Sequence, residues 1–186
     1  EPYLSRYNYS PPISLYDGEI AFMDEQIGRL SKWLKANGLG EKTIMVLVGD
    51  HGEGLGEHGE LAHGYFIYDY AVHVPLIIST PDKRFQGKRV SLEVSTVDIF
   101  PTIIELAGLK DRAAQGRSLV QMMAGRKEKE IPAYCESMSP SLHYGWSPLL
   151  GLRTSQFKFI DAPRPELYDL KNDPDEYVDV QNKVPQ

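Results

Sequence analysis

The feature that most constrains the fold is an apolar run, Thr43–Val48, between an amphipathic pattern and a glycine-rich polar segment. Because the run is short and rich in β-branched residues, it is typical of a strand covered on both faces. Before it, apolar residues recur at steps of three and four over residues 14–38, which predicts a helix with one apolar face. A helix followed by a buried strand is half of an α/β repeat.

Further along the chain, the patterns predict a second buried strand at Val74–Ser79 and a short helix at Ser118–Met123. Ser95 or Thr96 is expected to begin a helix that ends at Leu106. After residue 130 the pattern becomes one of short strands and turns. These strands are predicted at Ala133–Ser137, Leu149–Thr154 and Phe157–Asp161, followed by a turn-rich tail.

The predicted fold class is therefore α/β, with parallel-type strands and flanking helices, plus a small C-terminal antiparallel sheet. We expect one α/β domain portion over residues 1–130 and a small antiparallel-sheet subdomain with a tail over residues 131–186. A length of 186 residues suits this organisation.

Charge and composition narrow the class of partner. A formal charge of −6 argues against nucleic acid or an anionic membrane as partner. No apolar run approaches the roughly 20 residues that span a bilayer. The N-terminal residues lack the apolar core of a signal peptide, which leaves the compartment open, an exported or periplasmic location included. The single cysteine, Cys135, excludes an internal disulfide and a thiolate-cluster metal site.

The segment Asp50–His63 carries the most chemistry, since it holds three of the five histidines. Asp50 and His51 follow the first buried strand directly, and ligands of open α/β sheets bind at the carboxyl ends of strands. Nearby glycines permit a tight change of direction, so both side chains can turn toward one point. A carboxylate beside an imidazole supplies about half of the coordination shell of a divalent metal such as Zn, Mn or Mg, and is less typical for Ca. A hydrogen-bonded loop pair is the alternative that these residues leave open.

The segment "GDHGEGLGEHGELAHG" resembles the C-terminal metal-ligand motif of the sulfatase family, within the alkaline phosphatase-like superfamily. Other motifs similar to those of the family stand in the family's order from about Tyr16 to the end. They are "YDGEIAFMDEQIGRL", "VPLIISTP", "VSTVDIFPTIIELAGL", "GRSL", "GLRTSQFKFI" and "ELYDLKNDPDE". The resemblance implies part of an alkaline phosphatase-like sandwich.

The same resemblance implies a metal-assisted hydrolase of small anionic sulfate esters. Asp50 and His51 match two ligands of one divalent cation (Ca, Mn, Mg or Zn), although many sulfatases have Asn where His51 stands. His63 matches a Lys or His that contacts the anionic oxygens of the substrate, so we expect it to bind substrate and take part in catalysis. Glu53 and His58 are expected to form hydrogen bonds that orient these groups, without contacting the metal or substrate themselves.

Catalysis in the family needs a nucleophile, which is a formylglycine made from Cys or Ser in a C/S-x-P/A-x-R motif or, in relatives, a Thr or Ser. Neither "CESMS" at Cys135 nor "SPSLH" at Ser139 matches that motif. We therefore expect the formylglycine and the remaining metal ligands outside this segment, in an N-terminal half of the same protein. The chain is then the C-terminal part of a longer enzyme, inactive as an isolated fragment.

Two alternatives keep the fold. Phosphodiester or phosphonate monoester hydrolysis, or phosphoglycerol transfer, would use the same metal ligands, because a tetrahedral anion presents similar oxygens. A formylglycine motif would favour sulfate esters and a Thr nucleophile would favour phosphoryl chemistry. The second alternative is a non-catalytic module with the same fold.

Several further residues receive structural interpretations. Arg153 and Lys158 are expected to be solvated charges on a strand face. His73 lies in an apolar context and is expected to be buried and structural. Asp98 is expected in the first turn of a helix. Trp146 and its tyrosine neighbour either form a pocket rim or pack ordinarily.

Overall fold

The computed structural model describes residues 3, 13–110 and 114–183. The chain forms two compact units, Glu1–Met45 with Ser79–Pro81, and Val46–Ile78 with Asp82–Gln186. The predicted domain boundary after residue 130 falls inside the second unit and stays a prediction. No described helix is both long and apolar enough to cross a membrane.

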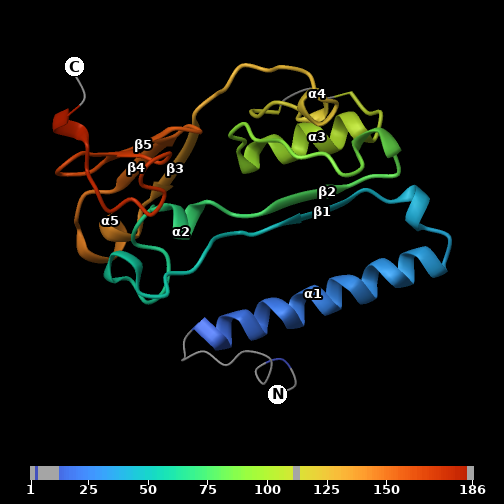
Figure 1. The fold of residues 1–186 in the computed structure, drawn as a ribbon, viewed down its shortest axis with the longest axis horizontal. Coiled ribbons are helices and arrows are strands. Elements are labelled where there is room, and N and C mark those ends of the chain that lie inside the picture. The colour runs from blue at the N-terminus through green and yellow to red at the C-terminus, as the bar shows by residue number, and fades with distance from the viewer. Residues whose placement is uncertain (1–2, 4–12, 111–113, 184–186) are drawn as a thin grey trace. The chain divides into compact units, whose positions relative to one another are not determined.

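The first unit contains one long helix, α1 (Ile13–Ala36), which confirms the helix predicted from apolar periodicity (Figure 1). It ends where Gly38 adopts a left-handed conformation with φ of 68°. The amide of Gly38 donates to the carbonyl of Lys35 (3.1 Å) and that of Leu39 to the carbonyl of Leu34 (2.9 Å). Such bonds satisfy carbonyls that the last turn leaves without partners. The short helix η2 (Gly40–Lys42) follows.

Strands β1 (Met45–Val48) and β2 (Leu76–Ser79) pair with each other in a two-stranded sheet, so both predicted strands are present. The amide of Gly49 donates to Pro75 (3.2 Å) and that of Gly52 to Ala71 (2.8 Å), so the chain returns antiparallel to itself. Parallel-type strands were predicted, but residues 50–75 turn back beside β1 without crossing over (Figure 1). Val48 and Ile77 are exposed, although both strands were expected to be covered on both faces.

After β2 the second unit builds a small helical cluster from η4 (Lys83–Phe85), η5 (Thr96–Asp98), α3 (Ile99–Leu106) and α4 (Val120–Met123). Ser95 and Asp98 form a capping box, which confirms the predicted helix start and the place of Asp98 in its first turn. The apolar core of this cluster consists of Phe85, Leu119, Met122 and Met123.

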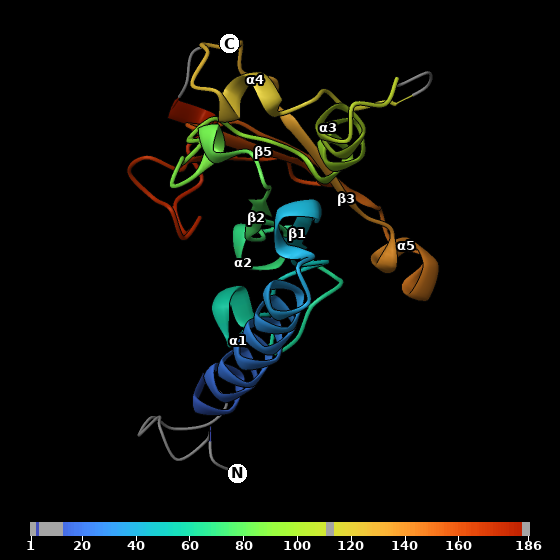
Figure 2. The same ribbon diagram turned by 90° about the vertical axis from the view of Figure 1, so that its right-hand side faces the viewer.

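The C-terminal sheet is antiparallel, with strands in the order β3-β4-β5-β6. Its strands are β3 (Ala133–Ser137), β4 (Leu149–Arg153), β5 (Phe157–Asp161) and β6 (Glu166–Asp169). Three of them were predicted, whereas β6 falls in the segment expected to be a turn-rich tail. Short helices α2 (Asp69–Val72), α5 (Ser139–Tyr144), η3 (Glu57–Gly59) and η6 (Gln181–Lys183) complete the unit (Figure 2).

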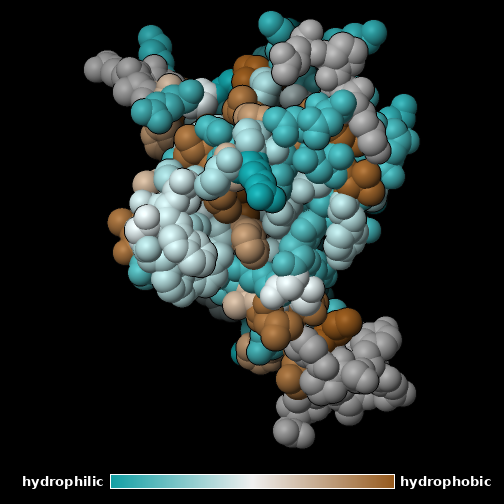
Figure 3. Space-filling model, turned by 90° about the vertical axis from the view of Figure 1, so that its left-hand side faces the viewer, coloured by the Kyte–Doolittle hydropathy of each residue, from teal (hydrophilic) through white to brown (hydrophobic). Residues whose placement is uncertain are grey.

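The sheet packs around a small core of Ile67, Ile160, Tyr168 and Leu170. The α/β class with a small C-terminal antiparallel sheet is therefore confirmed. Large apolar side chains also reach the surface of both units. Figure 3 shows hydrophobic residues in separate patches among hydrophilic ones on one face.

Candidate functional site

The loop that leaves β1 depends on glycine because its backbone lies against other backbone. A Cβ atom at Gly52 would lie 1.8 Å from the carbonyl oxygen of Tyr70, and one at Gly54 would lie 2.7 Å from that of Ala62. The amide of Gly54 donates to the same Ala62 carbonyl at 2.8 Å. Only glycine permits these approaches. The close packing fixes the path of the loop directly after Asp50 and His51.

Asp50 and His51 present one oxygen and one nitrogen donor side by side. The backbone amide of His51 donates to Asp50 Oδ1 (3.1 Å), and this bond holds the pKa of Asp50 below its usual value. His51 Nδ1 lies 2.9 Å from the carbonyl oxygen of Gly52, where it can only donate. His51 Nε2 then keeps its lone pair, 3.6 Å from Asp50 Oδ2. The Asp50 side chain is 91% exposed, so its charge faces outward.

His63 lies against this pair. Its ring stacks on that of His51, with centroids 3.8 Å apart and an angle of 27° between the planes. On its other side, His63 Nδ1 lies 3.2 Å from Glu53 Oε2. The contact with Glu53 orients the ring through Nδ1, and no described residue forms a hydrogen bond with Nε2. Glu53 thus contacts His63 directly, and its supporting role stays a prediction.

One cavity of about 550 Å³ in the second unit is lined by Asp50, His51 and His63 together. The sequence predicted that these three side chains converge, and the structure brings them to one space. Their roles as metal ligands and substrate contact remain predictions.

His58 lies elsewhere. Its ring stacks on Tyr68 at 3.7 Å and on Tyr177 at 4.9 Å, and its Nε2 lies 2.9 Å from the carbonyl oxygen of Asp175. These contacts hold its backbone in a left-handed conformation with φ of 51°. His58 is not among the residues that line the cavity. Its described contacts therefore join the loop to the C-terminal tail and not to Asp50 or His51.

The sequence interpretation missed other residues on the cavity wall. His73 was expected to be buried, but its side chain is 57% exposed and lines the cavity, with Nδ1 3.7 Å from Asp69 Oδ2. It escapes burial because it follows the end of α2 and precedes β2. Glu93 and Cys135 also line the cavity, and burial raises the pKa of each.

Arg153 and Lys158 were expected in solvent, and this expectation was wrong. Lys158 is fully buried, with Nζ 2.9 Å from Asp69 Oδ1 and 3.0 Å from Glu176 Oε1. Arg153 donates to both oxygens of Asp69 and to Glu93. Burial alone would raise the pKa of Asp69, but the hydrogen bonds from Arg153 and the charge of Lys158 hold it below its usual value.

The alternation of side chains along β5 could have predicted that Lys158 is buried. It stands two residues before Ile160 in β5, and side chains two apart on a strand share a face. Ile160 belongs to the sheet core, so Lys158 points inward as well. Its acidic partners lie in α2 and in the tail, far away in sequence, and no local pattern identifies them.

The family resemblance implies a divalent metal, and the donor atoms of Asp50 and His51 suit one. Asp50 offers an ionised oxygen and His51 a free nitrogen, both accessible, which suits part of a divalent-metal shell. Among the described residues, no group of three or more His, Cys, Asp or Glu side chains is placed to hold a metal ion. The chain therefore fits as the source of two ligands.

Two family models of sulfatases together match residues 2–185. Residues 2–109 match a family model described as Sulfatase. Residues 56–185 match a model described as N-sulphoglucosamine sulphohydrolase, C-terminal. The two matches overlap over residues 56–109, from the loop after β1 to just past the end of α3.

Curated relatives include Delta 4,5-hexuronate-2-O-sulfatase of Bacteroides thetaiotaomicron, 31% identical over 91% of this chain and 37% of the relative. Arylsulfatase K of Gallus gallus is 32% identical over 93% of this chain and 34% of the relative. The chain thus spans about a third of the length of the curated relatives it matches.

Among solved structures, the phosphonate monoester hydrolase of Agrobacterium radiobacter is 32% identical with a TM-score of 0.79, over 92% of this chain and 37% of that protein. Another is a protein in complex with its substrate D-glucosamine-2-N,6-O-disulfate. It is 30% identical with a TM-score of 0.73, over 90% of this chain and 36% of its own.

Proposed function

The chain belongs to the sulfatase family, and from this premise we propose that the whole protein is a metal-dependent hydrolase of sulfuric esters. The observation that carries the proposal is that Asp50, His51 and His63 line one cavity, with accessible donor atoms. Packing alone gives no reason to place an ionised carboxylate and two imidazoles there. The non-catalytic alternative offers no use for this arrangement.

We assign Asp50 and His51 as two ligands of one divalent ion. When bound, that ion would act as a Lewis acid toward the oxygens of the ester. Asp50 is ready to bind a cation because its carboxyl pKa is held low by the His51 amide. His51 is ready because its Nδ1 bond to Gly52 leaves the lone pair on Nε2. The identity of the ion (Ca, Mn, Mg or Zn) is left to metal analysis.

We assign His63 to the anionic end of the substrate. With Glu53 at Nδ1, the protonated ring would donate from Nε2 to a sulfuryl oxygen. The same donor would balance the charge that grows on the bridging oxygen as the ester bond breaks. Glu53 therefore acts by orienting His63.

We infer that the nucleophile, a formylglycine, lies outside these 186 residues, in an N-terminal part of the same protein. Cys135 does not replace it, because it lacks the motif and burial raises the pKa of its thiol. On this proposal the isolated chain does not turn over sulfate esters.

Sulfated sugars are the proposed substrate class. Support comes from the names of the relatives, which include a hexuronate 2-O-sulfatase, and from the solved structure with a glucosamine disulfate as substrate. A second candidate is phosphonate monoester hydrolysis, which is favoured by the structural similarity to a phosphonate monoester hydrolase.

The test compares Asp50→Ala with Asp24→Ala, a matched change at an exposed position of α1, in the full-length protein. We expect Asp50→Ala to weaken metal binding at least about 100-fold and to remove turnover. Asp24→Ala should alter neither. Metal content is measured by elemental analysis, and turnover with sulfate, phosphate and phosphonate esters. Unchanged metal content and turnover in Asp50→Ala would refute the assignment, and the preferred ester decides between the two candidates.

A further inference from the structure

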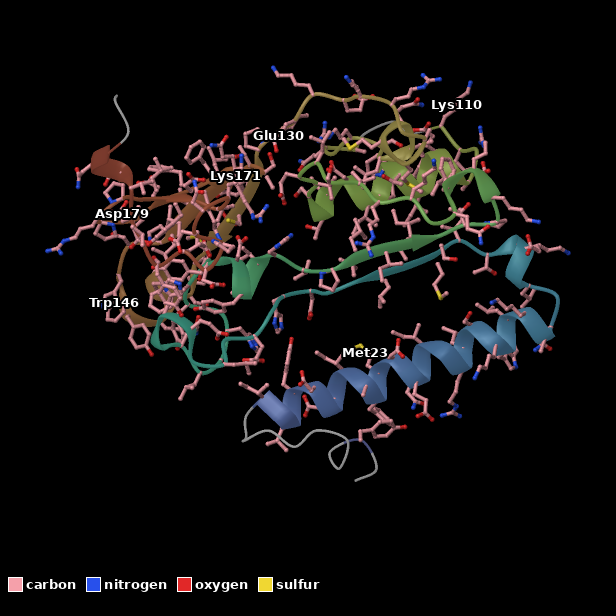
Figure 4. All side chains as sticks on the ribbon, in the orientation of Figure 1. Met23, Lys110, Glu130, Trp146, Lys171 and Asp179 are labelled. Carbon is pink, nitrogen blue, oxygen red and sulfur yellow. The ribbon has the colours of Figure 1, made fainter. Side chains whose placement is uncertain are left out.

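A second hollow, of about 620 Å³, lies beside the cavity and has aromatic walls. We refer to it as the aromatic groove. Its walls come from the loop after β1, which supplies Tyr65 and Phe66, and from α5 with the turn that follows, which supply Tyr144 and Trp146. Figure 4 shows Trp146 at the edge of the second unit, in the segment after α5.

The aromatic rings of this groove are held in place by one another. Tyr144 and Trp146 stack with centroids 4.8 Å apart and an angle of 29° between the planes. Gly145 between them has φ of 67°, a left-handed turn that suits glycine and ends α5. The hydroxyl groups of Tyr65 and Tyr144 lie 3.2 Å apart in a hydrogen bond, which joins two segments far apart in sequence. The groove is therefore a prearranged surface.

In the part of the chain that the structure describes, these rings are nevertheless exposed. Trp146 is 65% exposed and Tyr144 is 54% exposed. Exposed aromatic clusters of this kind mark binding surfaces, because their burial by a ligand is favourable.

Of the residues described, those on the wall of the groove offer no free charge to a ligand. Glu60 is the one carboxylate among these lining residues, and it is buried. Its Oε2 accepts a bond from the Tyr70 hydroxyl (2.5 Å), and its Oε1 accepts one from the Tyr65 amide (3.2 Å). A fitting ligand is therefore an uncharged ring with an apolar face for stacking and hydroxyl groups for the tyrosine hydroxyls.

The groove and the cavity adjoin at Phe66. Phe66 lines both spaces, and Tyr65 follows His63 by two residues on the same loop. A substrate whose ester group meets His63 can extend its organic part toward the groove. We propose that the aromatic groove binds a sugar ring of the substrate, with Trp146 and Tyr144 as the stacking surface. This inference rests on the proposed function for the position of the ester, but the groove itself can be tested without catalysis.

The first experiment measures binding alone, with glucose as the probe. The indole N–H resonance of Trp146 is identified as the signal that Trp146→Phe removes, and that of Trp33 serves as the internal control. We expect a saturable shift of the Trp146 signal in the millimolar range and none at Trp33. Absence of a saturable shift would overturn the proposal, whatever the enzyme does. A dimer that Trp146→Ala dissolves, without any effect of glucose, would assign the groove to a second copy and would also overturn it.

The second experiment measures selectivity, with a monosulfated glucose and methyl sulfate as substrates of the full-length protein. Trp146→Ala should lower kcat/KM for the glucose ester about tenfold and leave methyl sulfate unchanged, because only the former has a ring to stack. Trp33→Ala is the matched control, since Trp33 is similarly exposed at 55% and lies in α1. Equal losses with both esters would contradict the groove. If no ester is turned over, the proposed function fails, and the glucose titration still decides on the groove.

Discussion

The charged side chains around Asp69 and those around Asp50 belong to the same compact unit and meet opposite surroundings. Asp69 is nearly buried and is bonded to both Arg153 and Lys158. Asp50 is 91% exposed, and its described polar contacts are the amide and ring of His51 beside it. Both groups line or adjoin the same cavity, since Arg153 reaches its wall.

Structural charge and functional charge differ in this chain in how completely they are paired. Around Asp69 the opposite charges neutralise one another, as burial requires. Around Asp50 the donor atoms retain free lone pairs and accessible space, which a ligand can use. Accessibility together with incomplete pairing, and not the presence of charge, therefore identifies the candidate site.

The largest expected effect comes from breaking the buried cluster. Lys158→Met leaves Glu176 and Asp69 without their common cation, so we expect a loss of about 3–5 kcal/mol in the free energy of unfolding. Urea denaturation measures it, with the exposed Lys171→Met as control (Figure 4). Adding Glu176→Gln to Lys158→Met should recover part of the loss. A loss no larger than that of the control would show that the cluster is not a structural centre.

An intermediate effect is expected at the open site. Glu53→Gln weakens the contact that orients His63, so we expect turnover to fall about 10- to 100-fold with an unchanged melting temperature. His58→Ala is the contrasting variant, because His58 stacks on tyrosines away from the cavity. It should lower stability by about 1 kcal/mol and leave metal affinity unchanged. Lost stability in Glu53→Gln together with lost metal affinity in His58→Ala would contradict this. It would make Glu53 the structural residue and His58 the residue that supports the site.

The smallest effect concerns Cys135. It lines the cavity, and burial raises the pKa of its thiol. A raised pKa means less thiolate at a given pH, so labelling by a disulfide reagent should be slower than that of free cysteine. The rate should keep rising as the pH passes about 8.5, the ordinary thiol value. A rate that levels off below that pH would contradict the burial of Cys135.

Much of the fold was accessible from sequence where local periodicity decides the structure. The helix α1 shows its apolar steps directly, and β3 and β5 lie where the pattern predicted them. The pattern failed where polar residues form regular structure. Strand β6 is short and is followed by "LKND", which is typical of a turn, but pairing with β5 makes Glu166–Asp169 a strand.

The candidate site was predictable only in part. Asp50, His51 and His63 stand in one short segment, so a local motif reveals them. The position of Arg153 depends on a tertiary contact with Asp69, which no sequence spacing encodes. His73 lies only four residues from Asp69, but its apolar neighbours in sequence pointed to burial. His58 shows the same limit in reverse, since its place in the motif gave no sign of its contacts with the tail.

Hydrogen bonds between Gly49 and Pro75 and between Gly52 and Ala71 close the base of the loop that carries the site. They bring the start and the finish of the site-bearing loop together, where β1 ends and β2 begins. An excursion whose two ends meet can change in length or composition while the strands beneath it keep their pairing. Evolution can therefore replace this loop as a unit. In the same way, a loop with a different substrate specificity can be engineered between the ends of the two strands.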